Sequence, residues 1–175
     1  EWQPDSANFP SELPEIGHRN DARCFMILVP DDGPVNPQEF EANFPLGLIG
    51  LRELQKFSFT PIEESWPFVS MRAVEHTYGD EEISFVVVDP RGLIGGYEVE
   101  ISQEDVDTLQ LESPEDAMIY NIVTVHSSQP LHVTINLAGP LVINRRTFVG
   151  KQLVLVNAKN YSPRHLLIDQ RETAA

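Results

Sequence analysis

Short apolar runs with turn residues between them restrict the fold of this chain more than any other feature. Residues 57–62 alternate apolar and polar side chains with a period of two, as a half-buried strand does. Residues 83–88 are rich in β-branched side chains and end at Asp89-Pro90, which is typical of a central strand. Many short strands with turn signals between them predict an all-β, mainly antiparallel fold, either a small barrel or a sandwich. We favour a small β-barrel-like single domain.

The pattern predicts further strands and one or two short helices. We expect strands over residues 24–29, 97–101, 119–125, 131–137, 141–143 and 152–156, with a weaker candidate at 66–74. Ser102, followed by Asp105 three residues on, resembles a helix N-cap with an acidic third position, so a helix is predicted over 103–110. Ser113-Pro114 begins a second short helical turn in the same way. Residues 44–50, with two glycines and a proline, favour an irregular, partly buried loop.

The length of 175 residues suggests one domain with a core of its own. Residues 1–22 are polar and contain three prolines, which predicts an extended N-terminal arm. We place the β domain at 23–168 and a C-terminal tail at 169–175. No apolar run approaches the roughly 18 residues of a membrane helix, so no membrane partner is expected.

Charge is distributed unevenly along the chain. The net charge is −15, and 25 of the 27 acidic residues precede residue 117, together with 6 of the 12 basic ones. Residues 117–168 contain five basic residues and no acidic one. An acidic body beside an acid-free final third is a candidate polarised surface, although buried strands would also lack carboxylates. The acidic balance argues against direct binding of nucleic acid.

A single cysteine and the N-terminal sequence bear on the compartment. Cys24 is the only cysteine, so no disulfide can form within the chain, and its apolar neighbours predict a small buried side chain. The first residues lack the basic and apolar segments of a signal peptide, and we expect a cytoplasmic protein.

No pattern indicates catalysis, a metal or a cofactor. His126 and His132 flank one connection and could lie on neighbouring strands, but no spacing supplies the three or four ligands of a zinc site. The chain has no nucleophile elbow, phosphate loop or dinucleotide fingerprint. Acidic pairs fall at turns and strand ends, where solvated carboxylates are the ordinary interpretation. We therefore expect no enzyme activity.

Five blocks in order resemble the FliW family of flagellar assembly factors. Residues 44–50 read FPLGLIG, similar to the family's FPxGLxGF, with Leu51 in place of the final Phe. The other four blocks are FVVVDP at 85–90, YEVEI at 97–101, TINLAGPLVIN at 134–144, and Gly150, Gln152 and Leu155. The resemblance covers about residues 35–168. It departs from the family pattern at 70–82 and at 92–96.

The resemblance implies a barrel-like protein without catalytic chemistry or cofactors. FliW-like proteins bind flagellin in the cytoplasm and also bind CsrA, an RNA-binding translational regulator, which they keep off its messenger RNA. Flagellin competes for the same protein, so each partner would weaken the other. An acidic body docked beside CsrA would repel RNA phosphates within about a Debye length of 8 Å.

Partner contacts are expected on the polar faces and turns of the final third. We predict Thr134, Asn136, Asn144 and Arg145 as contact residues, with Tyr97 secondary. The two asparagines could equally serve as turn caps. The remaining motif residues are expected to be structural: Phe44, Pro45, Gly47, Gly50, Asp89, Pro90, Leu137, Pro140, Gly150 and Gln152.

Two alternatives remain open at the level of sequence. A small-ligand β-barrel would need a closed apolar pocket lined by Trp2, Trp66 or Phe68. A hydrolase would need paired carboxylates about 5–9 Å apart in a cleft.

Overall fold

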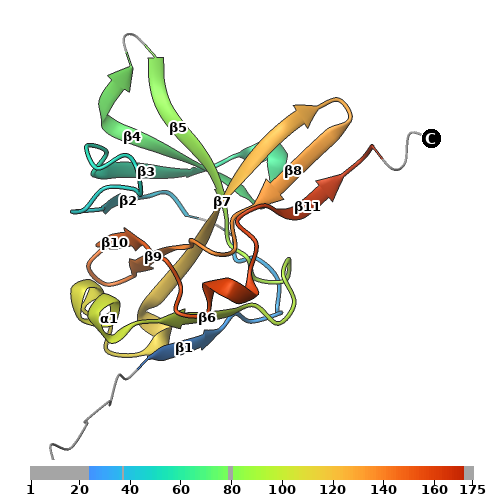
Figure 1. Cartoon of the computed structure of the whole chain (residues 1–175). Helices are drawn as coiled ribbons and strands as arrows, with labels where there is room; N and C mark the ends of the chain where they lie inside the picture. Colours follow the sequence, from blue (N-terminus) through green and yellow to red (C-terminus); the bar gives the residue numbers. More distant parts are fainter. Residues whose placement is uncertain (1–23, 37, 79–80, 172–175) are drawn as a thin grey trace, which may run out of the picture.

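Two β-sheets and one short α-helix make up the computed structural model, which describes residues 24–36, 38–78 and 81–171 (Figure 1). The strands are β1 Phe25–Leu28, β2 Phe40–Asn43, β3 Lys56–Pro61, β4 Phe68–Tyr78, β5 Glu81–Val88, β6 Glu98–Ile101, β7 Ala117–Ser128, β8 Leu131–Ile135, β9 Leu141–Asn144, β10 Gly150–Gln152 and β11 His165–Asp169. The helix α1 spans Gln103–Leu109, and three 3-10 turns, η1 Glu63–Ser65, η2 Pro114–Asp116 and η3 Ala158–Asn160, complete the fold.

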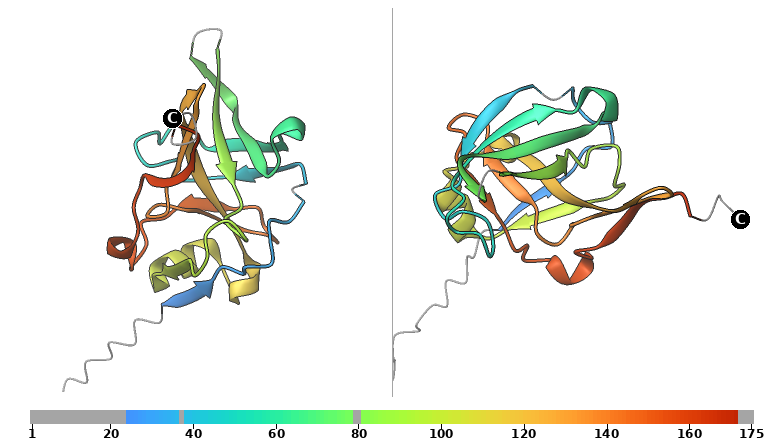
Figure 2. Two further views of the ribbon diagram at one scale, coloured as in Figure 1. Left: turned by 90° about the vertical axis from the view of Figure 1, so that its right-hand side faces the viewer. Right: turned by 90° about the horizontal axis from the view of Figure 1, so that it is seen from above.

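The large sheet is antiparallel and curled. Its order is β10-β9-β7-β5-β4-β3-β2, and β8 extends it by pairing with β7 and β11. The curl brings β2 back toward the β9–β10 turn, where an isolated parallel bridge joins Asn43 to Val149 (Figure 2). One bridge is not a continuous ladder, so the sheet is barrel-like without closing into a barrel.

The small sheet lies at the base of the molecule in Figure 1. It consists of β1 and β6, paired antiparallel from Phe25 opposite Ile101 to Leu28 opposite Glu98. Helix α1 follows β6 directly and lies beside it. Ser102 Oγ caps this helix by accepting a hydrogen bond from the Asp105 amide at 3.2 Å.

Two hydrophobic clusters fill the interior, and three central strands contribute to both. One cluster lies between the small sheet and the large one, with Val99, Ile101 and Leu109 among its buried residues. The other lies within the curl of the large sheet, around Phe44 and Phe57. β5, β7 and β9 have side chains in each cluster, which explains why apolar residues follow one another in them without alternation.

Two hairpins project from the body where the strands separate. β5 pairs with β7 only over Val86–Val88 and Asn121–Val123. Beyond those residues β5 continues beside β4, and β7 continues beside β8. In Figure 1 the β4–β5 hairpin therefore points upward while β7, β8 and β11 extend to the right.

Most predicted elements are confirmed. The all-β, mainly antiparallel class holds, and α1 and the capped turn η2 lie where the Ser102 and Ser113 signals placed them. Residues 68–74 of the weaker candidate at 66–74 lie in β4, the longer strand of the hairpin. The irregular loop over 44–50 is also present, held by a bridge between Leu48 and Leu51.

Two predictions are wrong, and some short strands were missed. Residues 152–156 form no strand beyond Gln152: Leu153 and Leu155 are buried, whereas the two valines beside them are exposed. Cys24 is exposed, because it precedes β1 and lies outside the paired residues. β2 and β11 were not predicted, since both are short and polar or mixed in composition.

The expected domain boundaries can be compared only in part. The arm at 1–22 lies outside the described residues. β11 runs to Asp169, one residue beyond the expected end of the β domain.

Candidate functional site

Two predicted contact residues, Thr134 and Arg145, differ in exposure: Thr134 is buried, whereas Arg145 is exposed. Thr134, in β8, places Oγ1 2.8 Å from Nε2 of His126. The His126 ring in turn lies 4.8 Å from that of His132, so the two histidines do lie on neighbouring strands. Arg145 follows β9 in an exposed turn and is anchored by its amide, which donates to Asp116 O at 2.8 Å.

Asn136 holds the turn between β8 and β9. Its side-chain Oδ1 accepts hydrogen bonds from the amides of Ala138 at 3.1 Å and Gly139 at 3.0 Å. This is an Asx turn, the arrangement in which asparagine satisfies backbone amides two and three residues ahead. Its side chain is half-buried, so part of it can still meet a partner.

Tyr97 and Asn121 form a buried polar pair behind that turn. The Tyr97 hydroxyl donates to Leu137 O at 2.7 Å and accepts from Asn121 Nδ2 at 3.2 Å. Asn121 Nδ2 also donates to Asn136 O at 2.7 Å. Burial raises the pKa of Tyr97 well above its usual value, with the Asn121 hydrogen bond acting in the opposite direction. The pair therefore joins β6, β7 and the β8–β9 connection.

Asn144 terminates helix α1. Its Nδ2 donates to Leu109 O at 2.9 Å and to Gln110 O at 3.0 Å, and its Oδ1 accepts from the Arg146 amide at 2.9 Å. Carbonyls at a helix C-terminus have no partner within the helix, and here a side chain 35 residues away supplies one.

Burial separates the five predicted contact residues into two groups. Tyr97 and Asn144 are 0% exposed, and all their polar groups described above bond internally. Neither can contact a partner in this conformation, so their place in the predicted contact set is corrected to a bracing role. Thr134 is also buried, at 8% exposed, so its predicted contact role is corrected in the same way. Asn136 and Arg145 keep exposed surface.

Sequence reasoning missed Asn121. It is fully buried in the middle of β7, and its Oδ1 accepts no hydrogen bond from the described residues. The available signal was a lone amide inside the apolar run 117–123, because a polar residue in such a strand usually has a specific partner.

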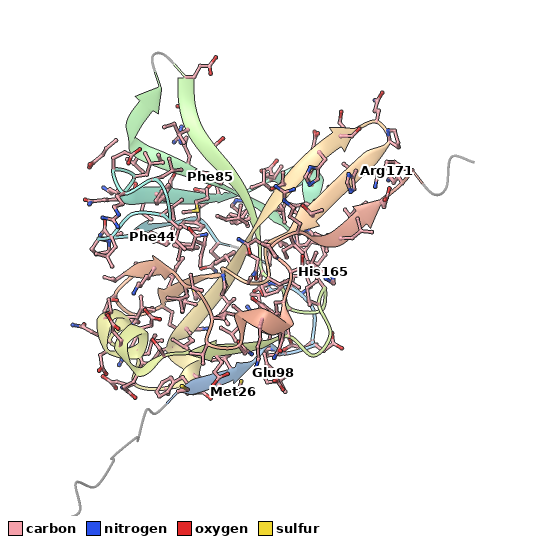
Figure 3. The ribbon with its side chains drawn as sticks, in the orientation of Figure 1. Met26, Phe44, Phe85, Glu98, His165 and Arg171 are labelled. Carbon is pink, nitrogen blue, oxygen red and sulfur yellow. The ribbon has the colours of Figure 1, made fainter. Side chains whose placement is uncertain are left out.

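The loop over 44–52 is braced by the motif residues expected to be structural. Gln152 Oε1 accepts from the Ile49 amide at 3.0 Å, and a side chain at Gly47 would approach the Arg52 backbone to 2.6 Å. Phe44 is fully buried and lies in the curl of the sheet, as Figure 3 shows. Its ring edge packs on Phe57 with centroids 5.4 Å apart.

Asp89 and Pro90 end β5 at a turn held by an ion pair. Asp89 receives the Arg91 guanidinium through both carboxylate oxygens, and its Oδ1 also accepts the Arg91 amide at 3.0 Å. Pro90 O accepts from the amide of Leu93 at 3.0 Å, which closes the following turn. Leu137 and Pro140 are both buried, so the expected structural interpretation fits them as well.

The expected separation of charge along the chain does not form a separate face. Arg146 pairs with Glu112 at 3.1 Å and Asp116 at 3.3 Å, and Lys151 pairs with Asp105. Two of the five basic residues of 117–168 are thus paired with acidic residues of the preceding part. β9 is buried throughout, and β7 is buried or half-buried from Ala117 to Val123, which accounts for the lack of carboxylates there.

The described residues named for a small-ligand pocket do not form one. An open hollow of about 510 Å³ is lined by the 45–50 loop with Arg52, Gln55, Lys151 and Gln152, and neither Trp66 nor Phe68 lines it. Trp66 is instead 57% exposed. Among residues 24–36, 38–78 and 81–171, no three His, Cys, Asp or Glu side chains gather as a metal site would require.

Two carboxyl groups, those of Asp116 and Asp169, have a lowered pKa, which favours their ionised form. A hydrogen bond from the Glu112 amide, with further contributions from Ser113 and Arg146, lowers the pKa of Asp116. The Arg171 guanidinium lowers the pKa of Asp169 in the same direction. A general acid needs the opposite shift.

These features define a small, mainly antiparallel β protein whose turns are braced by buried amide side chains. The model of the FliW protein family matches residues 17–167, and the chain belongs to the FliW family. No helix among the described residues is long and apolar enough to cross a membrane.

Relatives and a solved structure agree with this assignment. The flagellar assembly factor FliW of Natranaerobius thermophilus is 33% identical over 150 residues, covering 85% of this chain and 96% of the relative. That of Clostridium novyi is 34% identical over 133 residues, covering 76% and 89%. A crystal structure of the flagellar assembly factor FliW superposes with a TM-score of 0.66 at 27% identity, covering 84% of this chain and 99% of the other.

Proposed function

We propose that this protein is a non-enzymatic flagellar assembly factor that acts in the cytoplasm by binding two alternative partners, flagellin and a CsrA-type translational regulator. The observation that carries the proposal is the family match over residues 17–167, which spans both hydrophobic clusters and all eleven strands except the end of β11. Binding flagellin would free CsrA to repress flagellin translation, and loss of flagellin by secretion would reverse this. Reciprocal weakening of the two partners follows from linkage.

The charge of the chain supports an effect on RNA binding. With a net charge of −15, the protein would bring carboxylates close to a regulator that holds RNA through basic residues. Repulsion of phosphates acts within about 8 Å at physiological ionic strength, so it requires direct contact rather than proximity.

Arg145 is the contact residue best suited to a test. Its side chain is exposed and makes a long hydrogen bond, from Nη2 to Ala117 O at 3.5 Å. Asn136→Ala would also remove the Asx turn, so a loss of binding there would have two explanations. Arg164 is an exposed arginine in a different loop and provides a matched control.

The test is a binding measurement with purified flagellin and purified CsrA. We expect the wild-type chain to bind each protein and each to displace the other. Arg145→Glu should weaken binding by about tenfold, which is about 1.4 kcal/mol, while Arg164→Glu should have little effect. If the wild-type chain bound neither flagellin nor CsrA, the proposed function would be overturned. Equal binding by both arginine variants would remove only Arg145 from the contact surface.

A further inference from the structure

The base of the molecule carries an exposed apolar face that no described residue covers. It is formed by β1, by β6 and by the extended segment 153–156, and we call it the base face. Met26 and Leu28 of β1 are 49% and 63% exposed, and Val154 and Val156 of the segment are 70% and 51% exposed. Figure 3 shows Met26 close to Glu98 at this end of the molecule.

Hydrogen bonds place the three segments side by side. β6 pairs with β1 along one edge, with Met26 opposite Glu100 and Leu28 opposite Glu98. Along its other edge, Glu100 O accepts the Val156 amide at 3.0 Å. Asn157 adds a second connection, because its Nδ2 donates to Glu98 O at 3.0 Å.

Alternation then decides which side chains face outward. Ile27, Val99 and Leu155 point into the hydrophobic cluster and are at most 9% exposed. Their neighbours in sequence must point away from it, because side chains alternate along extended backbone. Two rows of apolar side chains thus lie on either side of Glu98 and Glu100, separated by about two strand spacings, or roughly 10 Å.

The two central carboxylates have no cationic partner among the described residues. The ion pairs of residues 24–36, 38–78 and 81–171 involve neither Glu98 nor Glu100. Carboxylates without cationic partners, placed between exposed apolar side chains, favour a ligand that carries positive charges at the ends of apolar chains. Arginine and lysine have this form, since their methylene stems cover apolar surface while their charged heads reach outward.

We propose that the base face binds an extended protein segment that presents arginine or lysine together with apolar residues on one of its faces, at every second position. The apolar side chains and the arginine stems would pack on Met26, Leu28, Val154 and Val156, with the guanidinium groups on Glu98 and Glu100. A second copy of this face would bring like carboxylates together. The chain's own residues 1–23 contain five acidic residues against two arginines, so their charge is also unfavourable. The proposal concerns the chemistry of the bound segment and holds for any protein that carries it.

The experiment uses three seven-residue synthetic peptides and the full-length chain. Serine occupies every even position of each peptide. The odd positions alternate arginine with valine in the first peptide, glutamate with valine in the second, and arginine with serine in the third. We expect the arginine–valine peptide to bind at least about tenfold more tightly than either of the others, as measured by calorimetry or fluorescence anisotropy. The second peptide lacks the cationic side chains that would meet Glu98 and Glu100, and the third lacks the apolar side chains that would pack on the exposed rows.

Matched variants locate the binding. Leu28→Ser with Val156→Ser removes apolar surface, and Glu98→Lys reverses a central charge; both should weaken the arginine–valine peptide by about fivefold or more. Ile49→Ser and Glu64→Lys change equally exposed residues elsewhere and should not. Because these positions are exposed, thermal unfolding should show that each variant folds as the wild type does. No binding by the wild type, or equal binding by base-face and control variants, would overturn the proposal, whatever the result with flagellin and CsrA.

Discussion

At the scale of single residues, buried amide side chains connect segments that are far apart in the sequence. Asn121 links β7 to Tyr97 and to the β8–β9 turn, and Asn144 links β9 to the end of α1. Each replaces bonds to water with bonds to buried backbone, so its removal leaves carbonyls without partners.

Asn144→Ala should therefore lower the free energy of unfolding by about 2–3 kcal/mol, because two carbonyls of the α1 terminus and the Arg146 amide lose their partner. Denaturant unfolding followed by circular dichroism measures the change. Asn160→Ala, at an exposed asparagine, is the matched control and should change stability by less than about 0.5 kcal/mol. Similar losses for the two variants would contradict the helix-bracing role.

Tyr120 should make stability depend on alkaline pH. Burial raises its pKa to about 12, the charge of Asp89 acts in the same direction, and Arg91 acts against it. An unfolded phenol titrates near 10. Between about pH 10 and pH 12 the unfolded chain thus holds fewer protons than the folded one, and stability falls as the pH rises, after being fully present below about 10.

The measurement is unfolding free energy against pH for the wild type and Tyr120→Phe. Between about pH 10 and pH 12, the free energy of unfolding of the variant should fall by about 1.4 kcal/mol less per pH unit than that of the wild type. Below about pH 10 the two proteins should show the same pH dependence. Parallel profiles over the whole range would show that Tyr120 titrates normally in the folded chain.

At the scale of elements, contact between the 44–50 loop and β10 depends on a residue without a side chain. A Cβ at Gly150 would lie 2.6 Å from Cζ of Phe44, whose ring is fully buried and packed on Phe57. The loop motif and the Gly-x-Gln block are distant in sequence, yet each requires the other.

Gly150→Ala should consequently destabilise the fold by about 1–3 kcal/mol, the ordinary cost of overpacking a filled core. Gly95→Ala is the control, since a Cβ there meets nothing within 4 Å. Thermal unfolding of both variants would show the difference. A Gly150→Ala protein as stable as Gly95→Ala would mean that the Phe44 ring can move aside.

Elements also differ in how well local sequence predicts them. β3 and β5 were predictable because their alternation or β-branched content is local. β2 and β11 were not, because each is a short strand held by a neighbour, β3 or β8, rather than by its own pattern. The opposite error occurred at 152–156, where an apolar run predicted a buried strand but its two valines face solvent.

At the scale of the whole molecule, the two hydrophobic clusters share their central strands. In β9, Leu141 and Ile143 belong to the cluster within the curl, and Val142 belongs to the cluster above the small sheet. Neither cluster can lose its packing without disturbing a strand of the other.

We accordingly expect a single cooperative unfolding transition. Ile101→Ala in one cluster and Met71→Ala in the other, both at most 1% exposed, should each cost about 2–5 kcal/mol and shift the same transition. Calorimetry compared with circular dichroism tests this. Two separated transitions in either variant would show that the clusters unfold independently.

The sequence by itself determined the strand-rich class, the Ser102 helix cap and the FliW family resemblance, because alternation, capping and motif order are all written in neighbouring residues. Only the tertiary structure decided which motif residues are accessible. Asn144 and Arg145 are adjacent, yet the first is buried against α1 and the second is exposed, since their environments depend on segments more than 25 residues away. The charge distribution follows the same rule. In the acid-free final third, Arg146 and Lys151 pair with carboxylates from earlier in the chain, because the order of strands in space is not their order in the chain.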